Sequence, residues 1–170
     1  HHEEFMKNGV HYILSPSIMV GKYRHGADIY DAIRRIFLLK NKKFDIIHAI
    51  DSRPSVIIPA LYLKKKYNIP LILEWSDLFS NGGIINERSG KLYRHTLGYI
   101  ESFFEIRFRL KADGAAVISK RLFKKLVEIG FANDKITIHR MGFKPDKFIN
   151  LSKQDSREYL NISKDEIIFS

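Results

Sequence analysis

Polar side chains gather directly after an apolar run in residues 71–83, LILEWSDLFSNGG. Asp77 is the candidate catalytic residue, because a carboxylate just past a strand end can bind substrate hydroxyl groups or act as a general base. Glu74 and Ser76 precede it and are candidate substrate ligands. The segment therefore predicts a site for hydroxyl recognition or acid–base chemistry.

The double glycine Gly82-Gly83 in the same segment has two interpretations. In the functional one, both glycines contribute to substrate binding, because a backbone without a Cβ can approach a ligand closely. In the structural one, they shape a turn that Asp77 caps, and Trp75 belongs to the core. The residues alone leave both interpretations open.

Polar residues also follow the other predicted strands. The further candidate substrate-binding residues are Asp51, Arg53, Ser119 and Arg140. Arg140 can pair with a phosphate or a carboxylate. Ser119 precedes a predicted helix, where it can donate to an anion or simply cap the helix. His48 lies inside a predicted strand, and a lone strand histidine is more often a core group than a catalyst.

Several well-defined chemistries are missing from the sequence. It has no GxxxxGK[ST] phosphate loop, no GxGxxG, no GxSxG nucleophile elbow and no HExxH. It has no cysteine, and its aspartates and histidines lack the spacing of a metal site. We therefore expect no metal and no bound cofactor.

Strand and helix patterns alternate along the chain and must position these residues. The predicted strands span 11–14, 44–50, 69–75, 112–118 and 135–139, and predicted helices begin near residues 28, 54, 90 and 120. Near-continuous Val/Ile/Leu strands form parallel sheets covered by helices on both faces. The expected fold class is α/β, a Rossmann-like three-layer sandwich with a mostly parallel sheet. Sites in such folds lie at the carboxyl ends of the strands, where the candidate residues fall.

Composition and charge narrow the classes further. The chain has 170 residues, 45% of them hydrophobic, with a formal net charge of +10. Such a charge suits nucleic acid, an anionic membrane surface or a phosphorylated substrate. No apolar run reaches the roughly 20 residues of a membrane helix. The amino-terminal HHEEFMKNG lacks the apolar region of a signal peptide. We expect a cytoplasmic protein with peripheral contact to the cytoplasmic face of the membrane.

Three segments resemble a known family. Residues 44–73, FDIIHAIDSRPSVIIPALYLKKKYNIPLIL, resemble a "D-x-[IV]-H … P … GIPLV" unit. Residues 112–148 look like "AD-x-V-x-x-x-S-x-x-L … K-I-x-V-I-x-N-G-V-D-x-x-x-F", and residues 74–90 are similar to a "D-W-x-D-W-x-x-x-G-G … E-R" variant. Their order and spacing resemble the amino-terminal domain of retaining GT-B glycosyltransferases of family 4, the glycosyl transferase group 1 family.

The resemblance implies an enzyme of two Rossmann-like domains facing a cleft. The carboxy-terminal domain would hold a nucleotide sugar, and this domain would hold a glycan, lipid-linked or protein acceptor. Transfer would retain configuration and need no metal, with the donor's own phosphate assisting the incoming hydroxyl. Many relatives have histidine where this chain has Ser76, so a histidine role there does not carry over.

The same resemblance predicts the domain organisation. Residues 1–148 would form the acceptor-side domain without its first strand, 149–163 a linker, and 164–170 the first strand of an absent donor domain. The Glu-x7-Glu motif that contacts the donor is missing, so we expect the isolated fragment to be inactive.

Two alternatives remain open. A basic module that binds nucleic acid or another polyanion needs exposed aromatic residues beside its cations, whereas the aromatics near residues 93–108 have core-like spacing. A sugar-nucleotide epimerase of the same GT-B architecture is the other. We expect no nucleic-acid partner.

Overall fold

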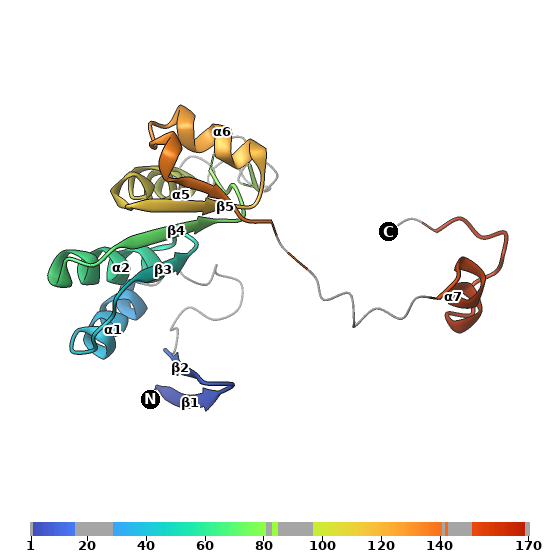
Figure 1. Ribbon diagram of the computed structural model, residues 1–170, viewed down its shortest axis with the longest axis horizontal. Helices are drawn as coiled ribbons and strands as arrows, with labels where there is room; N and C mark the ends of the chain where they lie inside the picture. The colour runs from blue at the N-terminus through green and yellow to red at the C-terminus, as the bar shows by residue number, and fades with distance from the viewer. Residues whose placement is uncertain are drawn as a thin grey trace. The chain divides into compact units, whose positions relative to one another are not determined.

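The computed structural model describes residues 2–15, 29–80, 83–84, 97–140, 142 and 151–168 (Figure 1). The chain divides into two compact units, His1–Arg140 and Met141–Ser170, and each is described by itself. The candidate site belongs to the first unit.

A four-stranded parallel sheet is the centre of the first unit. Its strands are β3 (Ile47–Ile50), β4 (Leu71–Trp75), β5 (Gly114–Val117) and β6 (Ile136–Ile138), in that spatial order. In the register, Leu73 lies between Ala49 on one side and Ala115 on the other. Helices connect consecutive strands, so the predicted α/β, Rossmann-like fold is confirmed.

Two of the helices, α2 (Pro54–Tyr67) and α6 (Lys120–Glu128), begin where the sequence provides start signals. The first unit also contains α1 (Ile29–Leu39) and α5 (Leu97–Arg107), with 3₁₀ turns η1 (Arg109–Lys111) and η2 (Asn133–Lys135). Pro54 occupies the first turn of α2, where its missing N–H costs no hydrogen bond. The hydroxyl of Ser119 accepts from the N–H of Leu122 and caps α6, and Gly130 follows that helix with a φ of 96°. The predicted helix starts near residues 54 and 120, and the capping role of Ser119, are confirmed.

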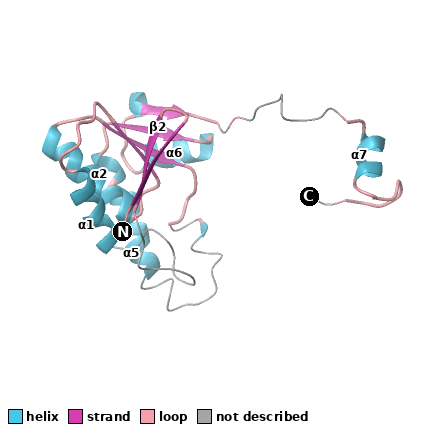
Figure 2. Cartoon of the chain, turned by 90° about the horizontal axis from the view of Figure 1, so that it is seen from below, coloured by secondary structure: helices cyan, strands magenta, loops and turns pink. Residues whose placement is uncertain are grey.

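One face of the sheet carries the core. Side chains of α2 pack with Ala49 and Leu73, and side chains of α6 pack with Trp75 and Val117. Phe104 of α5 joins the first of these clusters. Strands that follow one another in chain order, joined by right-handed crossovers, place their connecting helices on the same face. The predicted helix layer on the other face is therefore not seen among the described residues. Helices α1 and α2 lie side by side in both views (Figure 1, Figure 2).

The amino-terminal strand prediction needs a correction in its pairing. Strand β2 (Val10–Leu14) does form, but it pairs antiparallel with β1 (Glu3–Lys7), which the sequence reading missed. Asn8 and Gly9 join them, with φ values of 52° and 77°. Positive φ at both turn residues is the requirement of the tightest hairpin turn, and Asn-Gly is its strongest sequence signal.

The helix predicted to begin near residue 90 buries other side chains than the core-like spacing of its aromatics indicates. Residues 90–96 lie outside the described part, and α5 and η1 account for the rest. Tyr99 and Phe103 are 71% and 49% exposed, whereas Glu105 and Arg109 are each 2% exposed. The buried side of α5 and η1 is therefore partly charged, because Glu105 of α5 and Arg109 of η1 find polar partners in the core.

The second unit contains one described helix, α7 (Lys153–Tyr159), within the segment 149–163 predicted as a linker. The hydroxyl of Ser152 caps it by accepting from the N–H of Asp155 at 3.1 Å. Residues 164–168 form a turn and irregular backbone, and the predicted domain boundaries stay predictions. Across the described segments of both units, no helix has the length and apolarity needed to cross a bilayer.

Candidate functional site

A cavity of about 540 Å³ opens at the carboxyl ends of β4 and β5. The loop after β4 forms one wall, and α6 with its cap forms the other. Four residues singled out from the sequence line it: Ser76, Asp77, Gly83 and Ser119. They meet because parallel neighbouring strands end at the same edge of the sheet.

Asp77 and Lys124 face this cavity from opposite walls. Asp77 comes two residues after β4 and is exposed, and Lys124 lies on the outer side of α6. Neither forms a hydrogen bond or an ion pair with any other residue that the structure describes. The cavity therefore presents a carboxylate and an ammonium group to a ligand.

Gly83 is required by the loop itself. Its N–H donates to the carbonyl of Ser80 at 2.9 Å, and the N–H of Ile84 donates to the carbonyl of Leu78 at 2.9 Å. A Cβ on Gly83 would lie 2.0 Å from the Leu78 carbonyl oxygen, a separation too short for any side chain at this position. The close approach seen at Gly83 is thus to its own chain, and Gly82 lies outside the described residues.

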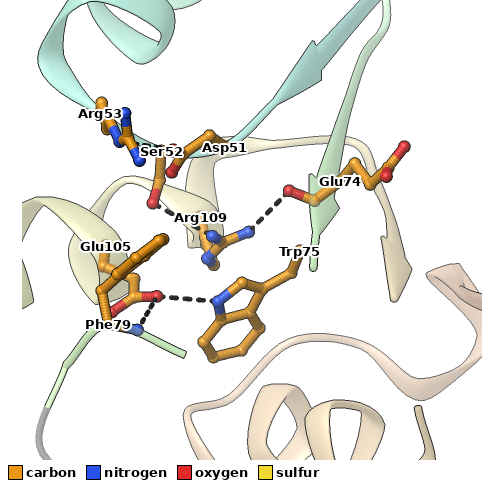
Figure 3. A network of polar contacts seen from close by, with 8 residues as sticks. All are labelled: Asp51, Ser52, Arg53, Glu74, Trp75, Phe79, Glu105 and Arg109. Carbon is orange, nitrogen blue, oxygen red and sulfur yellow. Dashed lines mark hydrogen bonds and ion pairs between the residues drawn. The ribbon is translucent and has the colours of Figure 1, made fainter. Parts of the chain in front are cut away.

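A buried carboxylate fixes the loop that carries Asp77 (Figure 3). Glu105 Oε1 accepts from the indole Nε1 of Trp75 at 2.8 Å and from the N–H of Phe79 at 3.1 Å. Its Oε2 accepts from the N–H of Ser80 at 2.5 Å. Because a buried carboxylate is costly without partners, these three donors account for its place in the core.

Arg109 joins the ends of β3 and β4 (Figure 3). Its guanidinium donates to Ser52 Oγ at 3.1 Å and to the carbonyl of Glu74 at 3.3 Å, and lies 4.2 Å from the centre of the Trp75 ring. Burial lowers the pKa of Arg109 to about 10, while the charges of Glu105 and Asp51 oppose that shift. The guanidinium therefore keeps its charge at neutral pH.

The sequence reading missed Glu105 and Arg109. They stand four residues apart, with the acid first, inside a helix otherwise read as apolar. That spacing places both on the same side of a helix. An acid–base pair interrupting an apolar stripe was the available signal.

The loop after β3 pairs with itself. Asp51 has a φ of 78°, and its Oδ1 accepts from the N–H of Ser52 at 2.6 Å. Its Oδ2 lies 2.7 Å from Arg53 Nε in an ion pair, and the Arg53 guanidinium lies 5.5 Å from the Phe79 ring centre. Asp51 and Arg53 thus contact each other and the neighbouring loop, and neither lines the cavity.

Glu74 directs its carboxylate away from Arg109 (Figure 3). Glu74 Oε1 accepts from Ser76 Oγ at 3.2 Å, and Oε2 lies 3.2 Å from His48 Nε2. The His48 side chain is 48% exposed, so the interpretation of His48 as a core group is wrong. Glu74 does not line the cavity, but its carboxylate orients the hydroxyl of Ser76, which does.

Arg140 lies two residues past β6, exposed, and does not line the cavity. The structure therefore brings four of the predicted site residues to the cavity, whereas Asp51, Arg53, Glu74 and Arg140 lie outside its lining, with Glu74 contacting Ser76. Within the described part of the chain, no three His, Asp or Glu side chains converge as a metal site would require.

Comparison with known proteins adds no relative: models of protein families do not match the chain, and curated proteins do not match it either. The fold is thus a small α/β domain with a four-stranded parallel sheet.

Proposed function

We propose that the chain is the acceptor-side domain of a retaining glycosyltransferase, which moves a sugar from a nucleotide sugar to a glycan, lipid-linked or protein acceptor. The observation that carries this proposal is the cavity at the carboxyl ends of β4 and β5, lined by Ser76 and Asp77. Parallel α/β sheets hold their ligands at this edge. The motif resemblance over residues 44–148 supplies the enzyme class.

Two side chains of the cavity suit an acceptor's hydroxyl groups. The carboxylate of Asp77 can accept hydrogen bonds from them, and such charge-assisted bonds are the stronger kind. Ser76 donates its own hydrogen to Glu74, so its oxygen can still accept a hydrogen bond from a second hydroxyl group of the sugar. We assign Asp77 to binding and orienting the acceptor.

A glycan array probed with the chain itself tests this assignment. We expect binding to a restricted set of glycans. Asp77→Asn should weaken binding about tenfold or more, because hydrogen bonds to charged groups contribute about 1.5–3 kcal/mol. The matched control is Asp45→Asn, an exposed aspartate before β3 that is remote from the cavity lining. Absence of glycan binding, or equal binding by Asp77→Asn, would count against the proposal.

A polyanion-binding module is the second candidate, and one observation favours it. Tyr99 and Phe103 on α5 are exposed, contrary to the core-like spacing that argued against stacking on bases. Binding of random single-stranded oligonucleotides that falls steeply with salt, and is lost in Tyr99→Ala, would support this candidate.

A further inference from the structure

The cavity at the ends of β4 and β5 carries opposite charges on its two walls. Asp77 is on the loop wall, and the helical wall presents three cations and one acid: Arg121, Lys124, Lys125 and Glu128. A neutral sugar offers hydroxyl groups to Asp77 but no negative charge to these cations. The cations on the helical wall therefore indicate a ligand that has a negative charge as well as hydroxyl groups.

One of these cations already pairs with an acid of the same helix. Lys125 Nζ lies 3.5 Å from Glu128 Oε2, one turn along α6, so this cation is partly neutralised. Lys124 forms no hydrogen bond or ion pair with another described residue, and the same holds for Asp77. Lys124 is thus the cation of the helical wall that a ligand anion can pair with at the least cost.

The cap of α6 does not provide the anion site. Ser119 Oγ accepts from the N–H of Leu122 at 3.3 Å and so already has a role within the helix. The attraction for an anion comes from the side chains of the helical wall. That wall also carries Glu128, which pairs with Lys125, but its three cations outnumber this one anion, so the net charge facing the cavity from α6 is positive and attracts an anion.

We propose that this cavity binds an acceptor sugar that carries an anionic group, a phosphate or a carboxylate. The ring hydroxyl groups bind Asp77 and Ser76, and the anionic group pairs with Lys124 beside Arg121. Asp77 repels a bare anion, so both parts of the ligand are needed for tight binding. This inference rests on the proposed function, because it specifies the acceptor of the same site.

The fluorescence of Trp75 can report ligand binding at this cavity. Trp75 is the single tryptophan of the chain, it is bonded to Glu105, and it stands two residues before Asp77. The full chain is titrated with four probes: hexose phosphates, hexuronates, the matching neutral hexoses, and inorganic phosphate. Changes in tryptophan emission report binding, and calorimetry supplies the affinity. The phosphate and carboxylate arms identify which anion the site prefers.

We expect one anionic class to bind about tenfold or more tightly than its neutral sugar and than inorganic phosphate, since it alone forms both kinds of contact. Lys124→Gln should lower the affinity for the anionic sugar about five- to tenfold and leave the neutral sugar unaffected. Lys65→Gln is the matched control, because Lys65 is exposed on α2 and does not line the cavity.

The possible failures separate the inference from the proposed function. Equal affinity for neutral and anionic sugars, or an unchanged affinity in Lys124→Gln, overturns the inference and leaves a sugar site in place. Inorganic phosphate binding as tightly as the sugar phosphate also overturns it, because Asp77 would then play no part. Failure of every sugar to bind overturns both.

Discussion

The indole Nε1 of Trp75 donates to the carboxylate of Glu105 at 2.8 Å and so ties the end of β4 to α5 (Figure 3). Both side chains are almost fully buried. The same carboxylate receives the backbone N–H groups of Phe79 and Ser80. The wall of the cavity that carries Asp77 therefore depends on a helix residue that is absent from the cavity lining.

Glu105→Gln should destabilise the first unit by about 1–3 kcal/mol, the usual range for a buried group that loses its partner. An amide keeps one acceptor oxygen and turns an NH₂ group toward the N–H donors of the loop. Urea unfolding followed by Trp75 emission measures the change. Glu128→Gln, an exposed position, should stay within about 0.5 kcal/mol of the wild type. Equal effects of the two substitutions would show that the buried bonds contribute nothing.

Arg109→Lys keeps the charge but loses the planar fork that reaches Ser52 and the Glu74 carbonyl together. We expect a loss of about 1–3 kcal/mol in the free energy of unfolding and a changed Trp75 emission spectrum, because lysine cannot make both bonds and stack on the ring. Arg107→Lys on the exposed side of α5 is the control. An unchanged urea midpoint in Arg109→Lys would contradict the bridging role.

Gly83→Ala should destabilise the loop after β4, because the added Cβ would lie 2.0 Å from a backbone oxygen of Leu78. The backbone must shift, and such overpacking costs about 1–3 kcal/mol. Gly142→Ala is the comparison, since a Cβ there meets nothing within 4 Å. Thermal unfolding of both variants measures the difference. Equal melting temperatures would mean that the turn relaxes freely.

The hydrogen bonds of the Asp113 carboxylate lead us to expect that stability depends on pH in the acidic range. Its carboxylate accepts from Lys64 Nζ at 2.7 Å and from the N–H of Leu71 at 2.8 Å, and these bonds lower its pKa. A folded-state pKa below the unfolded one stabilises the protein above the unfolded value, and this stabilisation is lost as pH falls through the folded value.

Asp113→Asn should therefore lower the free energy of unfolding by about 0.5–1 kcal/mol near neutral pH, with the gap to the wild type closing in acid. Urea unfolding across the acidic range measures it. Asp134→Asn changes another exposed aspartate of the same unit and should leave the profile unaltered. A gap that stays constant with pH would exclude Asp113 as its source.

The location of the cavity was predictable from local patterns. The run LILEW alternates buried and half-buried residues as β4, and the serine before the next helical pattern caps α6 as expected. Parallel pairing of β4 with β5 then brings Asp77 and Ser119 to one edge. Each step relies on residues close together in sequence and on the general geometry of parallel sheets.

The sequence by itself determined the strand and helix periods, the α6 cap and the edge where the candidate residues meet. Only the tertiary structure decided which charged side chains are buried and which aromatics are exposed. The partners of Glu105 and Arg109 are up to 57 residues away along the chain, at Ser52. A charged group is buried in a core only when polar partners form hydrogen bonds with it. The residue pattern of α5 and η1 does not indicate which distant residues those partners are.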